Sequence, residues 1–133
     1  MSTFITYIWV AIGGALGSIS RYWLSGMVAS TYGDTFPLGT LIINILGSLV
    51  IGFFYTFTGP DGRIIASSDA RVFVMVGLCG GFTTFSSFSL QTLNLMRDGD
   101  FLRAGLNVVL SVALCMLFVW LGHVAAVALN HMK

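Results

Sequence analysis

The residues best able to do chemistry in this chain are glycines, hydroxyls and aromatic rings gathered in residues 77–89, which read GLCGGFTTFSSFS. Adjacent glycines each weaken a helix by about 1 kcal/mol relative to alanine. The Ser and Thr residues that follow compete for backbone hydrogen bonds. We therefore expect a helix that breaks within this segment. Free carbonyls at a break inside a membrane suit a hard cation such as Na⁺.

Phe85 and Phe88 are three residues apart, so they share a face if the helix resumes after the break. Ser86, Ser87 and Ser89 place hydroxyls around the two rings. Hydroxyl donors and the positive edges of aromatic rings can compensate a small, strongly hydrated anion without trapping it. The alternative, that these residues form an ordinary packing stripe, stays open on residue types alone.

Two polar residues lie in the apolar stretches that precede this segment. Asn44 can donate its NH₂ group to an anion or can bridge to another helix. Arg21 is either an interfacial anchor beside Tyr22 and Trp23 or a charge that lines an aqueous vestibule and attracts anions.

The last apolar stretch contains a polar stripe, in which Asn107, Ser111 and Cys115 recur at four-residue intervals on one helix face. Cys115 and the other cysteine, Cys79, stand apart from any metal-binding or redox spacing. We interpret both as reduced apolar fillers.

The composition is that of a membrane protein. Apolar types make up 56% of the 133 residues and charged types 8%, whereas a soluble domain carries about 25% charged residues. Charges bound four apolar windows, each long enough for one spanning helix. We predict an all-α integral membrane fold in a single domain, 1–133, with the third of four transmembrane helices broken. The predicted spans are 4–28, 38–58, 72–96 and 103–128. Gly13 and Gly17 predict close helix packing.

Several classes of function are excluded. No Ser/His/Asp set, metal-ligand cluster or phosphate loop supports an enzyme, and a net charge of +1 argues against nucleic-acid binding. A proton-coupled multidrug exporter needs a carboxylate within a span, but every acid here falls in a connection. A non-transporting assembly subunit would leave the polar third span unexplained.

The basic residues are balanced between the two membrane faces. The face with both termini and the second connection carries Arg63, Arg71 and Lys133. The other face carries Arg97 and Arg103, together with Arg21 if it reaches that interface. Because an excess of Lys and Arg on one face fixes orientation, the chain either inserts both ways and pairs as an antiparallel dimer or holds one weakly biased orientation.

Residues 13–22, 39–44 and 77–89 together resemble the fluoride channel family, also called Fluc or CrcB. The resemblance covers essentially the whole chain, and the third-span motif is its most specific part. It implies a dual-topology antiparallel homodimer in the bacterial inner membrane. It also implies passive export of toxic fluoride from the cytoplasm with rejection of chloride.

The resemblance further implies roles for individual residues. Asn44 would donate to fluoride near a vestibule, and Phe85 and Phe88 would line the pore. The backbone carbonyls of Gly80 and Thr83, from both subunits, would hold a structural Na⁺ at the dimer centre. The remaining assignments are a vestibule charge and a polar track, namely Arg21 for the vestibule and Thr84, Ser87, Asn107 and Ser111 for the track.

Two positions depart from the family pattern. Family members often carry Glu where this chain has Gln91, which can donate but cannot be charged. The track often begins with Tyr and continues with two Ser residues, where this chain has Asn107, Ser111 and the weak donor Cys115. We expect conduction nonetheless, because the Asn and both Phe residues are present.

Overall fold

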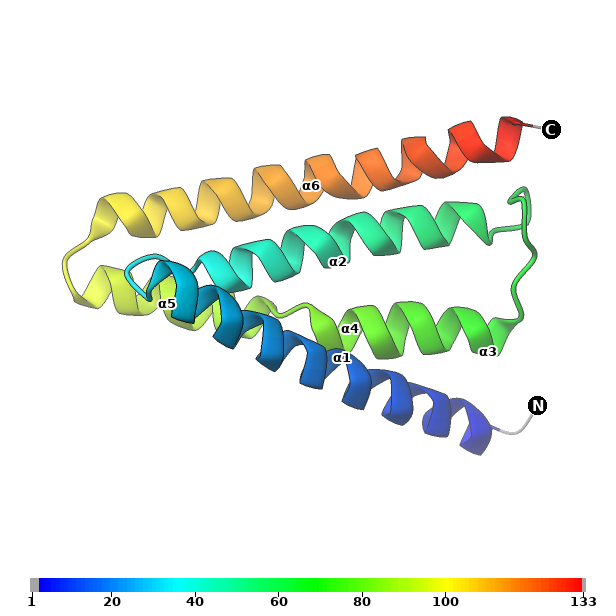
Figure 1. The fold of residues 1–133 in the computed structure, drawn as a ribbon, viewed down its shortest axis with the longest axis horizontal. Coiled ribbons are helices and arrows are strands. Elements are labelled where there is room, and N and C mark those ends of the chain that lie inside the picture. Colours follow the sequence, from blue (N-terminus) through cyan, green and yellow to red (C-terminus); the bar gives the residue numbers. More distant parts are fainter. Residues whose placement is uncertain (1–2, 133) are drawn as a thin grey trace.

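Four long helical segments run side by side in the structure, a computed structural model that describes residues 3–132 (Figure 1). Each segment is long and apolar enough to cross a membrane, which confirms the predicted number and order of spans. The spans are α1 Thr3–Tyr32, α2 Leu38–Phe57, a third span Ser68–Arg97 and α6 Phe101–His131. Lys133, which was counted in the charge balance, lies outside the described residues.

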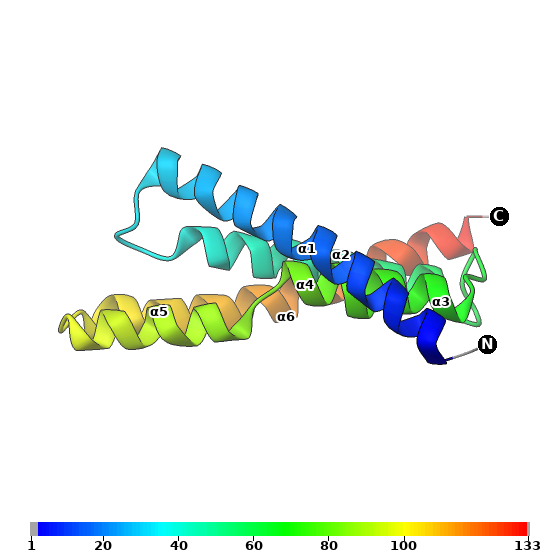
Figure 2. The ribbon, with the colours of Figure 1, turned by 90° about the horizontal axis from the view of Figure 1, so that it is seen from below.

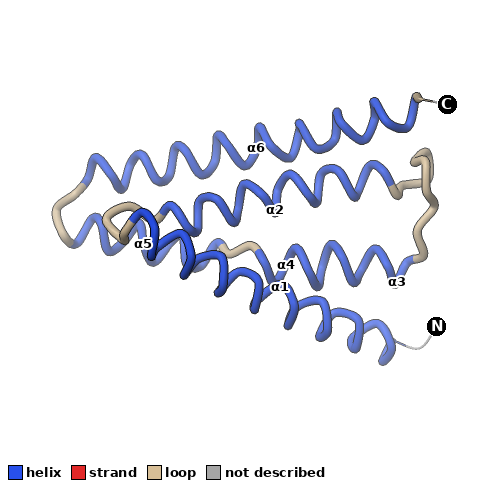
Figure 3. Tube along the Cα trace, viewed as in Figure 1, coloured by secondary structure: helices blue, strands red, loops and turns tan. Residues whose placement is uncertain are grey.

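The third span consists of several helical pieces rather than one. They are α3 Ser68–Arg71, the π-helical stretch η1 Val72–Cys79, the short α4 Gly80–Phe82 and, after the break, α5 Phe85–Arg97. Thr83 and Thr84, between α4 and α5, have extended backbone, with φ/ψ of −82°/159° and −154°/114°. The predicted break is therefore confirmed, and it is the one loop inside a span in Figure 3.

The predicted cause of the break is only partly right. Gly80 and Gly81 keep helical structure, and the chain leaves the helix at the two threonines. Gly81 instead permits close packing, since an added Cβ would lie 2.9 Å from the Gly14 Cα atom. Thr84 begins the new helix because its side chain accepts a hydrogen bond from the Ser87 N–H, as an N-cap residue does.

Helix α1 packs against the first half of the third span. Gly13 and Gly17, both buried, face η1 and α4. A Cβ at Gly13 would lie 2.6 Å from the Phe73 carbonyl oxygen, and one at Gly17 would lie 2.7 Å from the Phe82 nitrogen. The backbones thus touch, which confirms the packing predicted from this spacing. Beyond the break, α1 separates from α5 (Figure 2).

Helices α2 and α6 pack along their lengths. Glycines again allow the close approach, because a Cβ at Gly52 would meet the Val119 carbonyl and one at Gly122 would meet the Leu49 carbonyl. The two termini and the α2–α3 connection lie at one end of the bundle, and the α1–α2 and α5–α6 turns lie at the other (Figure 1). These turns use Gly33 and Gly99, whose φ values of 77° and 78° favour glycine.

Candidate functional site

Asn44 of α2 holds the break in the third span. Its Nδ2 donates to the Thr84 carbonyl at 3.1 Å, while the Thr84 N–H donates to Asn44 Oδ1 at 2.8 Å. One side-chain amide therefore satisfies both polar groups of a buried residue outside any helix. Asn44 is a bridge between spans, and the second N–H of its amide is still free to donate elsewhere.

The break leaves the carbonyls of residues 80–83 without their helical N–H partners. In a continuous helix the Thr84 N–H would bond the Gly80 carbonyl and the Ser87 N–H would bond the Thr83 carbonyl. Here the Thr84 N–H donates to Asn44 and the Ser87 N–H donates to Thr84 Oγ1 at 3.1 Å. Gly80 and Thr83 are thus two of the four residues whose carbonyl oxygens lose a helical partner, and Ser18 Oγ donates to the Gly81 carbonyl at 3.4 Å.

These residues border a pocket of about 400 Å³ between α2, the third span and α6, which we call the phenylalanine pocket. Phe85 and Phe88 lie on its wall with ring centroids 5.2 Å apart and planes inclined at 49°. Phe88 is 8% exposed, whereas Phe85 is 75% exposed in the single chain. The polar residues of the lining are Asn44, Ser48, Thr83, Thr84 and Ser111.

Thr84 also borders a second pocket, of about 380 Å³, which we call the Arg21 pocket. Arg21 and Ser87 line it together with Gln91. Among the described residues the one ion pair joins Arg103 and Asp100. The charge of Arg21 therefore faces this pocket without a carboxylate partner in the described chain, an arrangement that attracts anions.

The α6 stripe divides into two parts. Ser111 and Cys115 line the phenylalanine pocket, but Asn107 is 2% exposed and lies behind it. Asn107 Nδ2 donates to Thr92 Oγ1 at 2.9 Å, and that hydroxyl donates to the Phe88 carbonyl at 2.8 Å. Asn107 of α6 is thus linked, through the Thr92 hydroxyl, to the backbone of α5 at Phe88.

Sequence reasoning missed three residues of this site. Ser48 donates to the Asn44 carbonyl at 2.7 Å, and Thr92 links α5 to α6. Both stand four residues after a predicted site residue, which is the spacing that could have pointed to them. Gln91, noticed only as a departure, has a buried Oε1 with no hydrogen-bond partner in the described structure.

The acidic residues lie away from both pockets' centres. Asp69 lies in α3 at the start of the third span, and the others are in the connections or cap the α5 and α6 ends. No group of three or more His, Cys, Asp or Glu residues that could hold a metal occurs within residues 3–132.

Fold and site together define a class: a multi-pass membrane protein with a discontinuous helix of the kind that transport proteins use to handle ions. Residues 8–123 match the family described as CrcB-like protein, Camphor Resistance (CrcB), and the chain belongs to that family.

Relatives share most of the sequence. A protein of Opitutus terrae is 62% identical over 127 residues, covering 96% of each chain. One from Rhodospirillum rubrum is 63% identical over 126 residues, covering 95% of this chain and 98% of its own. A Methylocella silvestris protein is 61% identical over 127 residues, covering 96% and 97%. Each is named fluoride-specific ion channel FluC.

Proposed function

We propose that this chain is a fluoride-specific ion channel, not an enzyme, that lets fluoride leave the bacterial cytoplasm passively and so limits fluoride toxicity. The observation that carries the proposal is the phenylalanine pocket, whose polar lining is entirely uncharged and lies beside a helix break. The names of relatives that are more than 60% identical over nearly the whole chain support the same conclusion.

The chemistry of the pocket favours a small, strongly hydrated anion. Fluoride gives up its water only where close donors replace it. The second N–H of Asn44 can do so directly. The hydroxyls of Thr84 and Ser111 can do so by turning from their present acceptors, Ser87 Oγ at 3.0 Å and Asn107 Oδ1 at 3.5 Å. The edges of the Phe85 and Phe88 rings add weak positive potential. Because no fixed positive charge lines the pocket, the anion is compensated without being held. Arg21 concentrates anions at the neighbouring pocket.

The freed carbonyls support a structural sodium ion. The oxygens of Gly80 and Thr83 are hard ligands, and both residues line the phenylalanine pocket. A single chain supplies too few of them for a complete coordination shell. A second copy that brings the same two residues would complete the set. Replacing Na⁺ with N-methylglucamine should therefore weaken assembly and fluoride flux, and unchanged assembly would argue against the ion.

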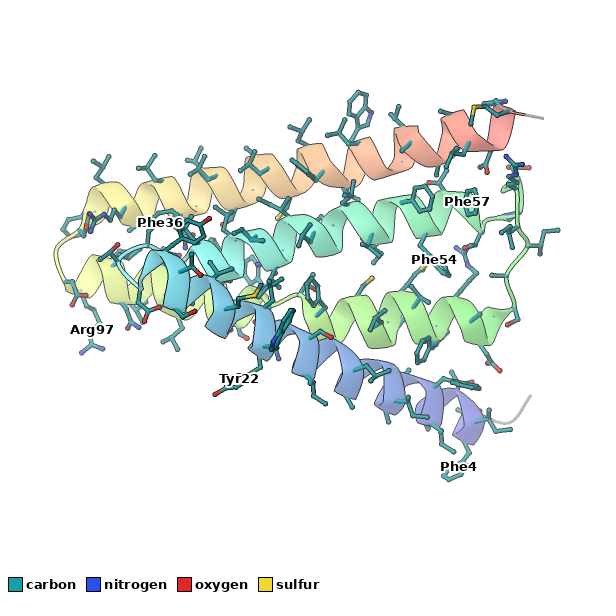
Figure 4. The ribbon with its side chains drawn as sticks, in the orientation of Figure 1. Phe4, Tyr22, Phe36, Phe54, Phe57 and Arg97 are labelled. Carbon is teal, nitrogen blue, oxygen red and sulfur yellow. The ribbon has the colours of Figure 1, made fainter. Side chains whose placement is uncertain are left out.

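An antiparallel homodimer fits the surface and the charges. Phe85 is a large aromatic residue that is exposed beside polar groups in the single chain, and a second copy would cover its ring. Arg63 and Arg71, on the face of the termini, donate to carbonyls near the ends of α6 and α2. Arg97 points away from the bundle at the other end (Figure 4), where Arg103 also lies. Neither face has a clear excess of basic residues.

The orientation has its own test. Reporter fusions at the C-terminus should signal from both faces of the membrane if the chain inserts both ways. A signal from one face alone would contradict the antiparallel dimer while leaving conduction untouched.

Anion efflux from liposomes tests the function directly. Purified protein should release loaded fluoride, while chloride should leave no faster than from protein-free liposomes. Phe85→Ile and Phe88→Ile should each slow fluoride efflux at least about tenfold, which corresponds to about 1.4 kcal/mol on the barrier. Phe4→Ile, at an aromatic residue that projects outward from the start of α1 (Figure 4), is the matched control. Equal release of both anions would contradict selectivity.

A further inference from the structure

Four sulfur-containing side chains line one pocket. Met75 and Cys79 approach the phenylalanine pocket from η1, and Cys115 and Met116 approach it from α6. Both cysteines are free thiols. The pair on η1 is four residues apart and the pair on α6 is consecutive, so each of these two helices contributes a thiol and a thioether to the lining of this pocket.

We propose that the phenylalanine pocket binds a soft monovalent metal cation, Cu⁺ or Ag⁺, through these sulfur atoms. Thiolates and thioethers are the protein ligands that such ions prefer. On binding, each coordinating cysteine releases its S–H proton to water and forms a sulfur–metal bond, while each methionine donates a sulfur lone pair. The metal keeps its oxidation state, so no oxidant or reductant is required.

The same pocket separates soft from hard cations. Its sulfur atoms come from side chains of η1 and α6, whereas the hard oxygens of Gly80 and Thr83 belong to the backbone at the break. Na⁺ should prefer the carbonyls and Ag⁺ the sulfurs, since ligand softness decides between them. Removing a thiol should therefore change the response to Ag⁺ and leave any dependence on Na⁺ unchanged.

Bound metal should also obstruct the ion path. Cys115 shares the pocket wall with Phe85 and Phe88, so a cation held there occupies the space proposed for fluoride. This consequence rests on the proposed function, but the binding itself does not. Binding and block therefore need separate measurements.

Binding is measured by equilibrium dialysis of the purified protein against silver nitrate in chloride-free buffer, with the bound metal determined by mass spectrometry. Cys115→Ser, at a half-buried position, and Cys79→Ala, at a residue 4% exposed, should each lower the Ag⁺ affinity at least about tenfold. Met75→Leu should lower it severalfold. Met96→Leu, at a methionine outside the pocket, should leave it unchanged. Wild-type protein that binds no Ag⁺, or cysteine variants that bind it as tightly as wild type, would overturn the proposal.

Fluoride efflux from liposomes then tests the block. Ag⁺ should stop efflux through the wild-type protein and through Met96→Leu, while Cys115→Ser should keep most of its own untreated efflux rate, whatever that rate is, at the same Ag⁺ concentration. Binding without block would overturn the placement of the metal in the ion path. Absence of fluoride efflux from every untreated sample would contradict the proposed function alone, because dialysis reports the metal site independently.

Discussion

The two halves of the third span meet their neighbours through different chemistry. Before the break, η1 and α4 touch α1 backbone to backbone, with Gly13 and Gly17 at the contact. After the break, α5 is joined to α6 by side-chain hydrogen bonds that run from Asn107 through Thr92. One half is fixed by close packing, and the other is held by polar groups.

The first half of the span is therefore the rigid half, and the second half carries most of the side chains proposed to meet the ion. Contacts between backbones allow no rotamer change, so the first half fixes where the Gly80 and Thr83 carbonyls lie. Side-chain contacts leave room for other groups, so the second half can present Phe85 and the neighbouring hydroxyls to a pocket. Asn44 bonds Thr84 between α4 and α5, where the tightly packed half ends and the polar half begins.

The largest effect should come from adding one methyl group to the packed half. Gly17→Ala places a Cβ 2.7 Å from the Phe82 nitrogen and in contact with the Leu78 carbonyl, neither of which can turn aside. We expect a loss of about 3 kcal/mol in stability, the upper end for overpacking, with little folded protein recovered. Thermal unfolding in detergent measures it.

Gly26→Ala is the matched control on the same helix, because nothing lies within 4 Å of its added Cβ. It should unfold at the wild-type temperature or slightly above it, because alanine favours an exposed helix over glycine by about 1 kcal/mol. Equal stability of the two variants would contradict backbone contact between α1 and the third span.

Asn44→Ala should break the junction itself. It leaves the N–H and carbonyl of Thr84 without their partner in a buried position, and we expect a loss of about 1–3 kcal/mol in stability. Because it also removes a proposed donor, fluoride efflux should fall by more than about tenfold. Efflux from liposomes and thermal unfolding measure the two effects.

Asn94→Ala changes the same residue type at an exposed position near the end of α5 and should leave both readouts unchanged. Asn44→Asp keeps the oxygen that accepts from Thr84 but loses the N–H donor. If efflux through Asn44→Asp equals that of wild type, Asn44 only holds Thr84 in place and does not donate to the ion.

The sequence predicts the packed half and the break better than it predicts the polar partners. Charges beside the apolar windows are enough to place four spans, and clustered Ser and Thr residues are enough to predict an interruption. The span ends are less predictable. Helix α1 runs past residue 28 to Tyr32. The Ser30 and Thr31 hydroxyls donate to the Met27 carbonyl at 2.9 Å, so these polar residues are satisfied within the helix.

The partners of the polar side chains depend on how the helices are rotated about their axes. Asn107 and Ser111 share a face by spacing and both are buried, yet Asn107 bonds Thr92 whereas Ser111 lines the phenylalanine pocket. Likewise, spacing cannot show that Asn44 uses both ends of its amide on one residue. Helix rotation is set by packing between spans, which a single sequence pattern does not encode.

A double-mutant cycle on the polar half should give a smaller effect. Thr92→Val removes the hydroxyl between Asn107 and the Phe88 carbonyl, leaving the buried amide without its acceptor. We expect a loss of about 1–3 kcal/mol in stability and a severalfold decrease in fluoride efflux. Unfolding and efflux are measured in parallel.

Adding Asn107→Leu to Thr92→Val should recover part of the stability, because replacing both partners of a buried hydrogen bond by apolar groups is nearly neutral. The recovery is incomplete because the buried Ser111 hydroxyl loses its acceptor, Asn107 Oδ1 at 3.5 Å. If the double variant loses the sum of both single effects, the two residues do not act as a pair.

The smallest expected effect concerns Arg21, where α1 lines the Arg21 pocket together with α5. Arg21 lines the Arg21 pocket with Thr84 and Ser87 and has no carboxylate partner in the described chain. If it acts only through its field, Arg21→Gln should slow fluoride efflux about two- to threefold at low ionic strength. The difference should vanish near 1 M salt, where the Debye length falls to about 3 Å.

Arg97→Gln, at an exposed arginine that points away from the bundle (Figure 4), should match wild type at every salt concentration. A defect of Arg21→Gln that persists in high salt would mean that α1 contacts the ion directly, and the separation between packing and ion chemistry would not hold for that helix.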